Sequence, residues 1–131
     1  MTFVLVVEDT ESFSDPLSYL LRKAGFEVAV CPTGFSALDM FERRGADLVL
    51  VDLTLRRPPA LELCRRLRAR SKVPVIALNG RDTEFDKLLG LELGADDYVP
   101  ESFSWPDLLG RIRTVLGRRP EEQRSHRALV V

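Results

Sequence analysis

Residues 2–30 read TFVLVVEDTESFSDPLSYLLRKAGFEVAV, and this stretch decides the fold class. Residues 2–7 and 27–30 are mainly apolar, which is typical of strands buried on both faces of a sheet. Between them, residues 12–24 carry leucines at helical spacing and stop before Gly25, a residue type that commonly caps helices. The stretch therefore predicts a strand–helix–strand unit.

The same alternation continues along the chain. Further strands are predicted at 47–51, 73–78 and 97–99, and further helices at 34–44, 60–70, 83–92 and 104–117. Alternating strands and helices predict a parallel sheet with helices on both faces. We therefore expect an α/β, flavodoxin-like (βα)5 fold, which is a doubly wound five-stranded parallel sheet with strand order 2-1-3-4-5.

The chain has 131 residues, which is enough for one domain with its own core. We assign residues 1–117 to this domain. From Gly117 the sequence reads GRRPEEQRSHRALVV, which is charged and interrupted by Pro120. We interpret residues 118–131 as a linker or tail that leads to an effector domain absent from this chain.

Composition argues against several classes of partner. The formal net charge of −1 gives no global attraction to nucleic acid or to an anionic membrane, so DNA contact would fall to the effector domain. No apolar stretch approaches the roughly 20 residues that span a bilayer, and the N-terminus lacks the features of a signal peptide. Cys31 and Cys64 have no metal-type spacing. We expect a cytoplasmic protein without membrane contact.

Acidic residues follow two of the predicted strands. Glu8 and Asp9 end the first strand, and Asp52 ends the third. In open α/β sheets, ligands bind beyond the carboxyl ends of the strands where the winding reverses, which here lies between the first and third strands. Carboxylates gathered there would repel one another without a cation, and hard oxygen ligands suit Mg²⁺. The alternative is that these are ordinary acidic residues near helix N-termini.

Several segments together carry a family resemblance. VLVVEDTESFSDPLSYLLRKAGFEV, ADLVLVDLTL, VPVIAL and GLELGADDYV resemble the receiver domain of OmpR/PhoB-type response regulators over roughly residues 3–117. The resemblance implies a signal-input domain of a two-component system rather than an enzyme. It implies that Asp52 accepts a phosphoryl group from a histidine kinase. It also implies that Mg²⁺ is held by Glu8, Asp9, Asp52 and the backbone carbonyl of Thr54.

The chain departs from the family pattern around this pocket, which makes it an atypical member. Asn79 stands where receivers usually have Thr or Ser, and Glu101 stands where they usually have Lys. Arg56 and Ala60 replace the usual Pro and Gly after the acceptor. The change at Glu101 matters most, because one unit charge pair at about 4 Å is worth about 4 kcal/mol at an effective dielectric near 20. Reversing that charge weakens the hold on a phosphoryl group.

Two arrangements of Glu101 remain open. Its side chain could turn into solvent and leave a weak but usable site. Alternatively, Arg56 or Arg57 could reach over the pocket, pair with Glu101 and hold the loop in one state.

The resemblance further implies a two-fold dimer through the fourth helix, the fifth strand and the fifth helix. Matching charges would pair across it as Lys87 with Asp107, Asp97 with Arg111, and Asp96 with Arg118. The alternative is that these are charges on solvated helix faces. Tyr98 matches the aromatic residue whose rotation reports phosphorylation in the family, although a buried core tyrosine is equally consistent with the sequence.

These observations favour the input domain of a DNA-binding transcription regulator that dimerises without phosphorylation. One alternative is a conventional receiver that a histidine kinase phosphorylates on Asp52 with weak chemistry. Another is a pseudo-receiver that senses a small molecule in the altered pocket.

Overall fold

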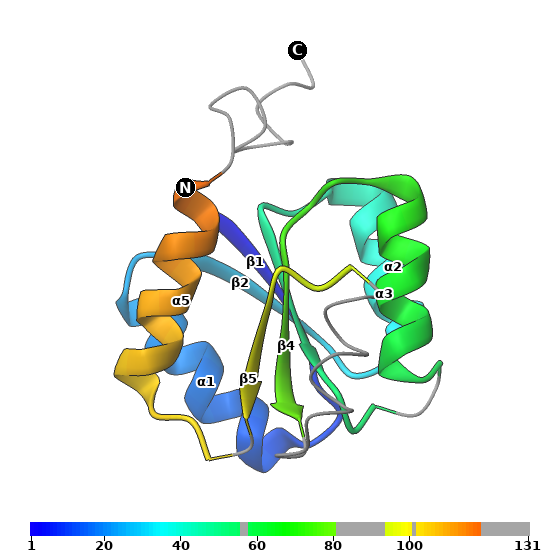
Figure 1. Cartoon of the computed structure of the whole chain (residues 1–131). Helices are drawn as coiled ribbons and strands as arrows, with labels where there is room; N and C mark the ends of the chain where they lie inside the picture. Colours follow the sequence, from blue (N-terminus) through cyan, green and yellow to red (C-terminus); the bar gives the residue numbers. More distant parts are fainter. Residues whose placement is uncertain (56–57, 81–93, 101, 119–131) are drawn as a thin grey trace.

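The computed structural model describes residues 1–55, 58–80, 94–100 and 102–118. Its centre is a five-stranded sheet in the order β2-β1-β3-β4-β5, and every neighbouring pair is parallel (Figure 1). The strands are β1 (Phe3–Val7), β2 (Glu27–Cys31), β3 (Leu48–Asp52), β4 (Val75–Gly80) and β5 (Asp97–Pro100). This arrangement confirms the flavodoxin-like fold and the strand order expected from the sequence.

Helices cover both faces of the sheet. On one face lie α1 (Glu11–Lys23) and α5 (Trp105–Gly117), and on the other lie α2 (Gly34–Arg44) and α3 (Ala60–Arg70) (Figure 1). The helix predicted at 83–92 lies outside the described residues. No helix in the described ranges is both long and apolar enough to cross a bilayer.

The predicted bounds of β4 need correction. The sequence predicted a strand over 73–78, whereas β4 runs from Val75 to Gly80. Pro74 has no N–H to give to a neighbouring strand, so the ladder begins after it. The strand then continues past its last apolar residue, Leu78, through Asn79 to Gly80.

The central strands contribute side chains to two separate hydrophobic cores, one on each face of the sheet. Phe3, Leu5 and Val7 of β1 belong to the core under α2 and α3, whereas Val4 and Val6 belong to the core under α1 and α5. All five are fully buried. Since successive side chains of a strand point to opposite faces, a strand with helices on both sides must be apolar throughout. Polar chemistry is therefore displaced to the ends of the strands.

The N-terminus of α2 packs closely against the loop after β3. Gly34 is the first residue of α2, and a Cβ atom placed there would lie 2.6 Å from Cδ of Pro58. The absence of a side chain at Gly34 thus lets this loop approach the helix. Pro58 belongs to the loop between β3 and α3, so this close approach brings that loop against α2.

Replacing two glycines with alanine should have opposite effects on stability. Gly34→Ala should lower the free energy of unfolding by about 1–3 kcal/mol, because the methyl group collides with the Pro58 ring. Gly110→Ala, at an exposed position of α5 with nothing within 4 Å, should raise it by about 0.5–1 kcal/mol. Urea unfolding of both variants tests this, and equal stability of the two would contradict the close packing at Gly34.

Candidate functional site

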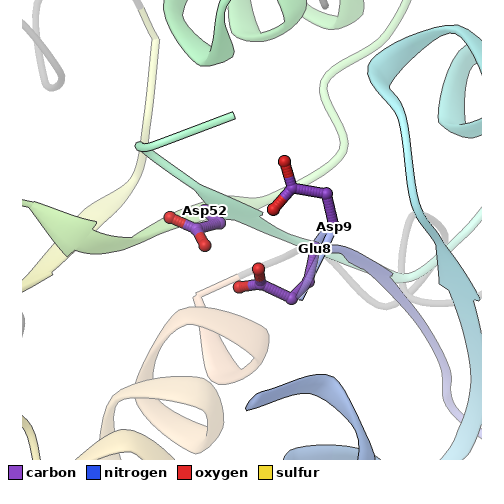
Figure 2. Close-up of side chains that lie close together, drawn as sticks. All are labelled: Glu8, Asp9 and Asp52. Carbon is purple, nitrogen blue, oxygen red and sulfur yellow. The ribbon is translucent and has the colours of Figure 1, made fainter. Parts of the chain in front are cut away.

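Three carboxylates meet at the carboxyl edge of the sheet. Val7 of β1 is in register with Val51 of β3, so the residues that follow them, Glu8 and Asp52, emerge side by side. Asp9 comes next on the same segment as Glu8. One carboxylate oxygen from each of Glu8, Asp9 and Asp52 lies within 4.8 Å of the others, around one small space (Figure 2). The structure therefore brings together the carboxylates that the sequence predicted.

The cluster holds an oxygen that lacks a hydrogen-bond donor. Glu8 and Asp52 are each only 3% exposed, whereas Asp9 is exposed. Oε1 of Glu8 accepts the Thr10 N–H at 3.0 Å, but its Oε2 is buried and finds no donor among the described residues. A buried carboxylate oxygen without a donor is costly. A divalent cation with oxygen ligands would satisfy it, so these residues fit Mg²⁺.

The same surroundings change the acidity of Glu8. Burial, together with the neighbouring Asp52 carboxylate, raises the pKa of Glu8 from its ordinary value of 4.5 to about 8. The Thr10 N–H acts in the opposite direction, and Asp9 adds a further increase in pKa. The cause is physical, since carboxylates that crowd a dry site cannot all keep their charge. A bound cation would favour the ionised form of Glu8 and reverse this effect.

Asp52 is held by a turn. Its Oδ1 accepts hydrogen bonds from both the backbone N–H and the hydroxyl of Thr54, each at 2.8 Å. The backbone also continues the ladder, because the Leu53 N–H donates to the carbonyl of Leu78 on β4. The sequence predicted a role for the Thr54 carbonyl but missed its hydroxyl. An Asp side chain commonly bonds to the backbone N–H two residues later, and that turn signal was available, but it does not predict the hydroxyl bond.

Asn79 lies in a β-bulge at the end of β4. Ala77 is in register with Tyr98 and Gly80 with Pro100, so Leu78 and Asn79 together oppose Val99. Asn79 has φ of 57°, and it is the one non-glycine residue with positive φ in the part of the chain that the structure describes. Asparagine tolerates this left-handed conformation, whereas a β-branched residue does so poorly. The backbone conformation at this position is therefore one that Asn can adopt with little strain.

Further departures from the family pattern were predicted from the sequence at Arg56, Ala60 and Glu101. Ala60 begins α3 and is buried. Arg56, Arg57 and Glu101 lie outside the described residues. Both expected arrangements of Glu101, in solvent or paired with the arginine loop, therefore stay predictions.

Arg111 joins two of the acids predicted to lie at a dimer surface. Within one chain, Arg111 bonds to Asp97 at 2.9 Å and to Asp107 at 3.2 Å. It also donates to the carbonyl of Tyr98 at 3.0 Å. The Asp97–Arg111 pair predicted between two subunits is thus already formed inside one.

Asp96 also has partners within its own chain. Arg68 of α3 bonds to Asp96 at 3.3 Å, and the Val75 N–H donates to the same carboxylate oxygen at 2.8 Å. Arg68 further donates to the carbonyl of Gly94 at 2.8 Å. Arg118, the predicted partner of Asp96 across a dimer, is exposed at the C-terminus of α5. Lys87 lies outside the described residues. The long-range contact with Arg68 was not predicted from the sequence.

Tyr98 is buried. It is 6% exposed and packs in a small cluster with Ala77 and Ala95, against Leu53. This position agrees with a core tyrosine. Its predicted role as an aromatic switch stays a prediction.

The fold and the site together define a class. A doubly wound parallel sheet with acids from β1 and β3 at its switch point is the architecture of a signal receiver domain. The sequence model of the response regulator receiver domain matches residues 4–113, and the chain belongs to this family.

Individual relatives agree with this assignment. The chain is 58% identical over 118 residues to the sensory transduction protein RegX3 of Mycolicibacterium smegmatis. This match covers 90% of this chain and 52% of RegX3. The chain therefore spans about half the length of the curated relatives it matches. RegX3 of Mycobacterium tuberculosis is 56% identical over the same length.

Solved structures show the same fold. The activated N-terminal receiver domain of RstA from Klebsiella pneumoniae, solved with BeF3, superimposes with a TM-score of 0.85 and 32% identity, covering 90% of this chain and 100% of that one. The receiver domain of the sensor histidine kinase PA1611 from Pseudomonas aeruginosa superimposes with a TM-score of 0.81 and 27% identity. The match covers 88% of this chain and 98% of that one. Its active-site cleft holds a coordinated magnesium ion.

The raised pKa of Glu8 predicts a pH dependence of stability. Folded Glu8 takes up a proton more readily than unfolded Glu8, so the stability from this group is fully present below about pH 4.5 and is lost as the pH rises through about 8. In EDTA, the free energy of unfolding of the wild type relative to Glu8→Gln should therefore fall over this range, by a few kcal/mol at most. Urea unfolding across this pH range tests this, and parallel curves for the two proteins would contradict it.

The bulge at Asn79 predicts an unusual order of stabilities. Asn79→Thr should be less stable than Asn79→Gly by about 1–2 kcal/mol, because a β-branched residue is strained at positive φ. At Val30, a half-exposed position of β2, the order should reverse, since threonine favours strands and glycine weakens them. Urea unfolding of the four variants is the measurement. A threonine variant at position 79 as stable as the glycine variant would count against the strained backbone.

Proposed function

We propose that this domain is the signal-input unit of a DNA-binding transcription regulator that holds Mg²⁺ at its acidic edge and dimerises without phosphorylation. The observation that carries the proposal is the intact cluster of Glu8, Asp9 and Asp52, combined with a carboxylate at position 101 where the family has a cationic lysine. This combination keeps the carboxylate ligands of a cation site but lacks the positive charge that would balance a phosphoryl group.

The cation site rests on the buried donor-free Oε2 of Glu8 and on the crowding of three carboxylates. Glu8, Asp9 and Asp52 would hold Mg²⁺, together with the backbone carbonyl of Thr54. The magnesium ion in the related PA1611 receiver supports this. When bound, Mg²⁺ supplies positive charge that offsets the acids and would polarise a phosphoryl oxygen.

The charge at position 101 argues against long-lived phosphorylation. Three carboxylates already meet at this edge of the sheet, and Glu101 stands at the sequence position where the family resemblance implies a lysine facing the acceptor. At about 4 Å and an effective dielectric near 20, exchanging attraction for repulsion costs several kcal/mol before screening. Asn79 is a milder change, because its amide can still donate a hydrogen bond.

Charges on β5 and α5 give the proposed dimer its orientation more than its strength. Asp97 and Arg111 are already paired in one chain, so a dimer would exchange or share existing ion pairs. Exposed pairs contribute about 0–1 kcal/mol each, and an exchange contributes less still. Repeated by two-fold symmetry, they would fix the register of a weak dimer.

The wider partners follow from the family. Response regulators of two-component systems work with a histidine kinase, and the RegX3 relatives are sensory transduction proteins about twice as long as this chain. We propose that DNA binding belongs to an effector domain beyond residues 118–131.

Sedimentation velocity and intact mass together test the proposal. The wild-type domain and Asp52→Asn should show the same weak dimer, with or without acetyl phosphate and Mg²⁺, because association does not use the acceptor. Arg118→Ala should weaken it by about two- to tenfold, since each dimer would lose two exposed ion pairs. Arg66→Ala, which removes an exposed arginine paired with Glu62 on α3, is the matched control and should leave association unchanged.

The conventional receiver is the second candidate, and the firm hold of Thr54 on Asp52 favours it. A stoichiometric gain of one phosphoryl group on Asp52, with dimers only after that gain, would establish this alternative and reject phosphate-independent pairing.

A further inference from the structure

The Thr54 hydroxyl makes a bond that the turn itself does not require. The backbone N–H of residue 54 already donates to Oδ1 of Asp52 at 2.8 Å, and any residue other than proline would supply that donor. The hydroxyl adds a second donor to the same oxygen at 2.8 Å. A side chain without a hydroxyl would leave the first bond and the fold of the turn unchanged.

Two donors on one oxygen restrict the whole carboxylate. The group is planar, so fixing Oδ1 also fixes the direction of Oδ2. Asp52 is 3% exposed and shares a small space with Glu8 and Asp9, where repulsion would otherwise favour rotation of its carboxylate away from theirs. Hydrogen bonds to a charged oxygen are stronger than neutral ones and oppose that rotation.

We propose that Thr54 is a positioning residue for the cation site, and that its hydroxyl orients Asp52 so that Oδ2 is presented to the ion shared with Glu8 and Asp9. This inference rests on the proposed cation site. The backbone carbonyl of Thr54 is a separate contribution, which every variant at this position keeps. The hydroxyl acts through Asp52 and touches no ion.

Thr54→Val has nearly the same shape and lacks only the hydroxyl. In this variant the Asp52 carboxylate keeps only the backbone donor, so more of its motion must be lost when the ion binds, and that loss weakens affinity. We expect Mg²⁺ to bind about three- to tenfold more weakly. Thr54→Ser keeps the hydroxyl and should restore affinity to within about twofold of the wild type.

Isothermal titration of each folded variant with MgCl₂ alone is the measurement, supported by the Mg²⁺-induced rise in Tm. Thr114→Val is the matched control, because it removes a hydroxyl that donates to the carbonyl of Gly110 on the exposed side of α5. Its Mg²⁺ affinity should equal that of the wild type, whatever its effect on stability.

The possible results distinguish the role of Thr54 from the existence of the cation site. Weaker binding by the valine variant and rescue by serine would support the role of Thr54. Equal or tighter binding by the valine variant, with normal binding by the wild type, would overturn that role and leave the cation site standing. Absence of Mg²⁺ binding by the wild type would overturn both.

Discussion

The parallel pairing of β1 with β3 is the constraint on which this site depends. Val7 and Val51 are in register, so the chain must place Glu8 beside Asp52 wherever the two strands end together. The strands are apolar and have helices on both faces, so the acidic side chains lie beyond the strand ends. The pairing that buries the sheet therefore also crowds the acids at its edge. The core that stabilises the fold also holds like charges together, at a cost that a cation, or a proton on Glu8, would offset.

The backbone around this edge is shaped by small local features. Gly34 admits the Pro58 ring, Thr54 holds Asp52, and Asn79 turns the end of β4 through positive φ. Each belongs to a different segment, and each follows or faces the end of a strand. All three act near the strand ends and not on the apolar layers between the sheet and the helices.

The repeated pattern of apolar strands and helices predicted the parallel sheet. The flavodoxin-like strand order then predicted the meeting of Glu8, Asp9 and Asp52, because the carboxyl ends of neighbouring parallel strands lie at one edge of the sheet. The same reasoning placed the end of β4 too early, since a bulge depends on the conformation of Asn79 and not on hydrophobic pattern. It also missed the bond from Arg68 to Asp96, which joins residues far apart in the chain. Periodicity carries information about layers and strand ends, whereas single side-chain contacts depend on rotamers that no spacing specifies.

The charges on β5 and α5 show why an intact surface does not by itself imply strong association. Arg111 is satisfied by Asp97, Asp107 and a backbone carbonyl, and Asp96 is satisfied by Arg68 and the Val75 N–H. A second copy of the chain would offer these groups equivalent partners, so the electrostatic difference between monomer and dimer is small. In the proposed dimer these charges would therefore set the orientation of the two copies and contribute little to the free energy of association.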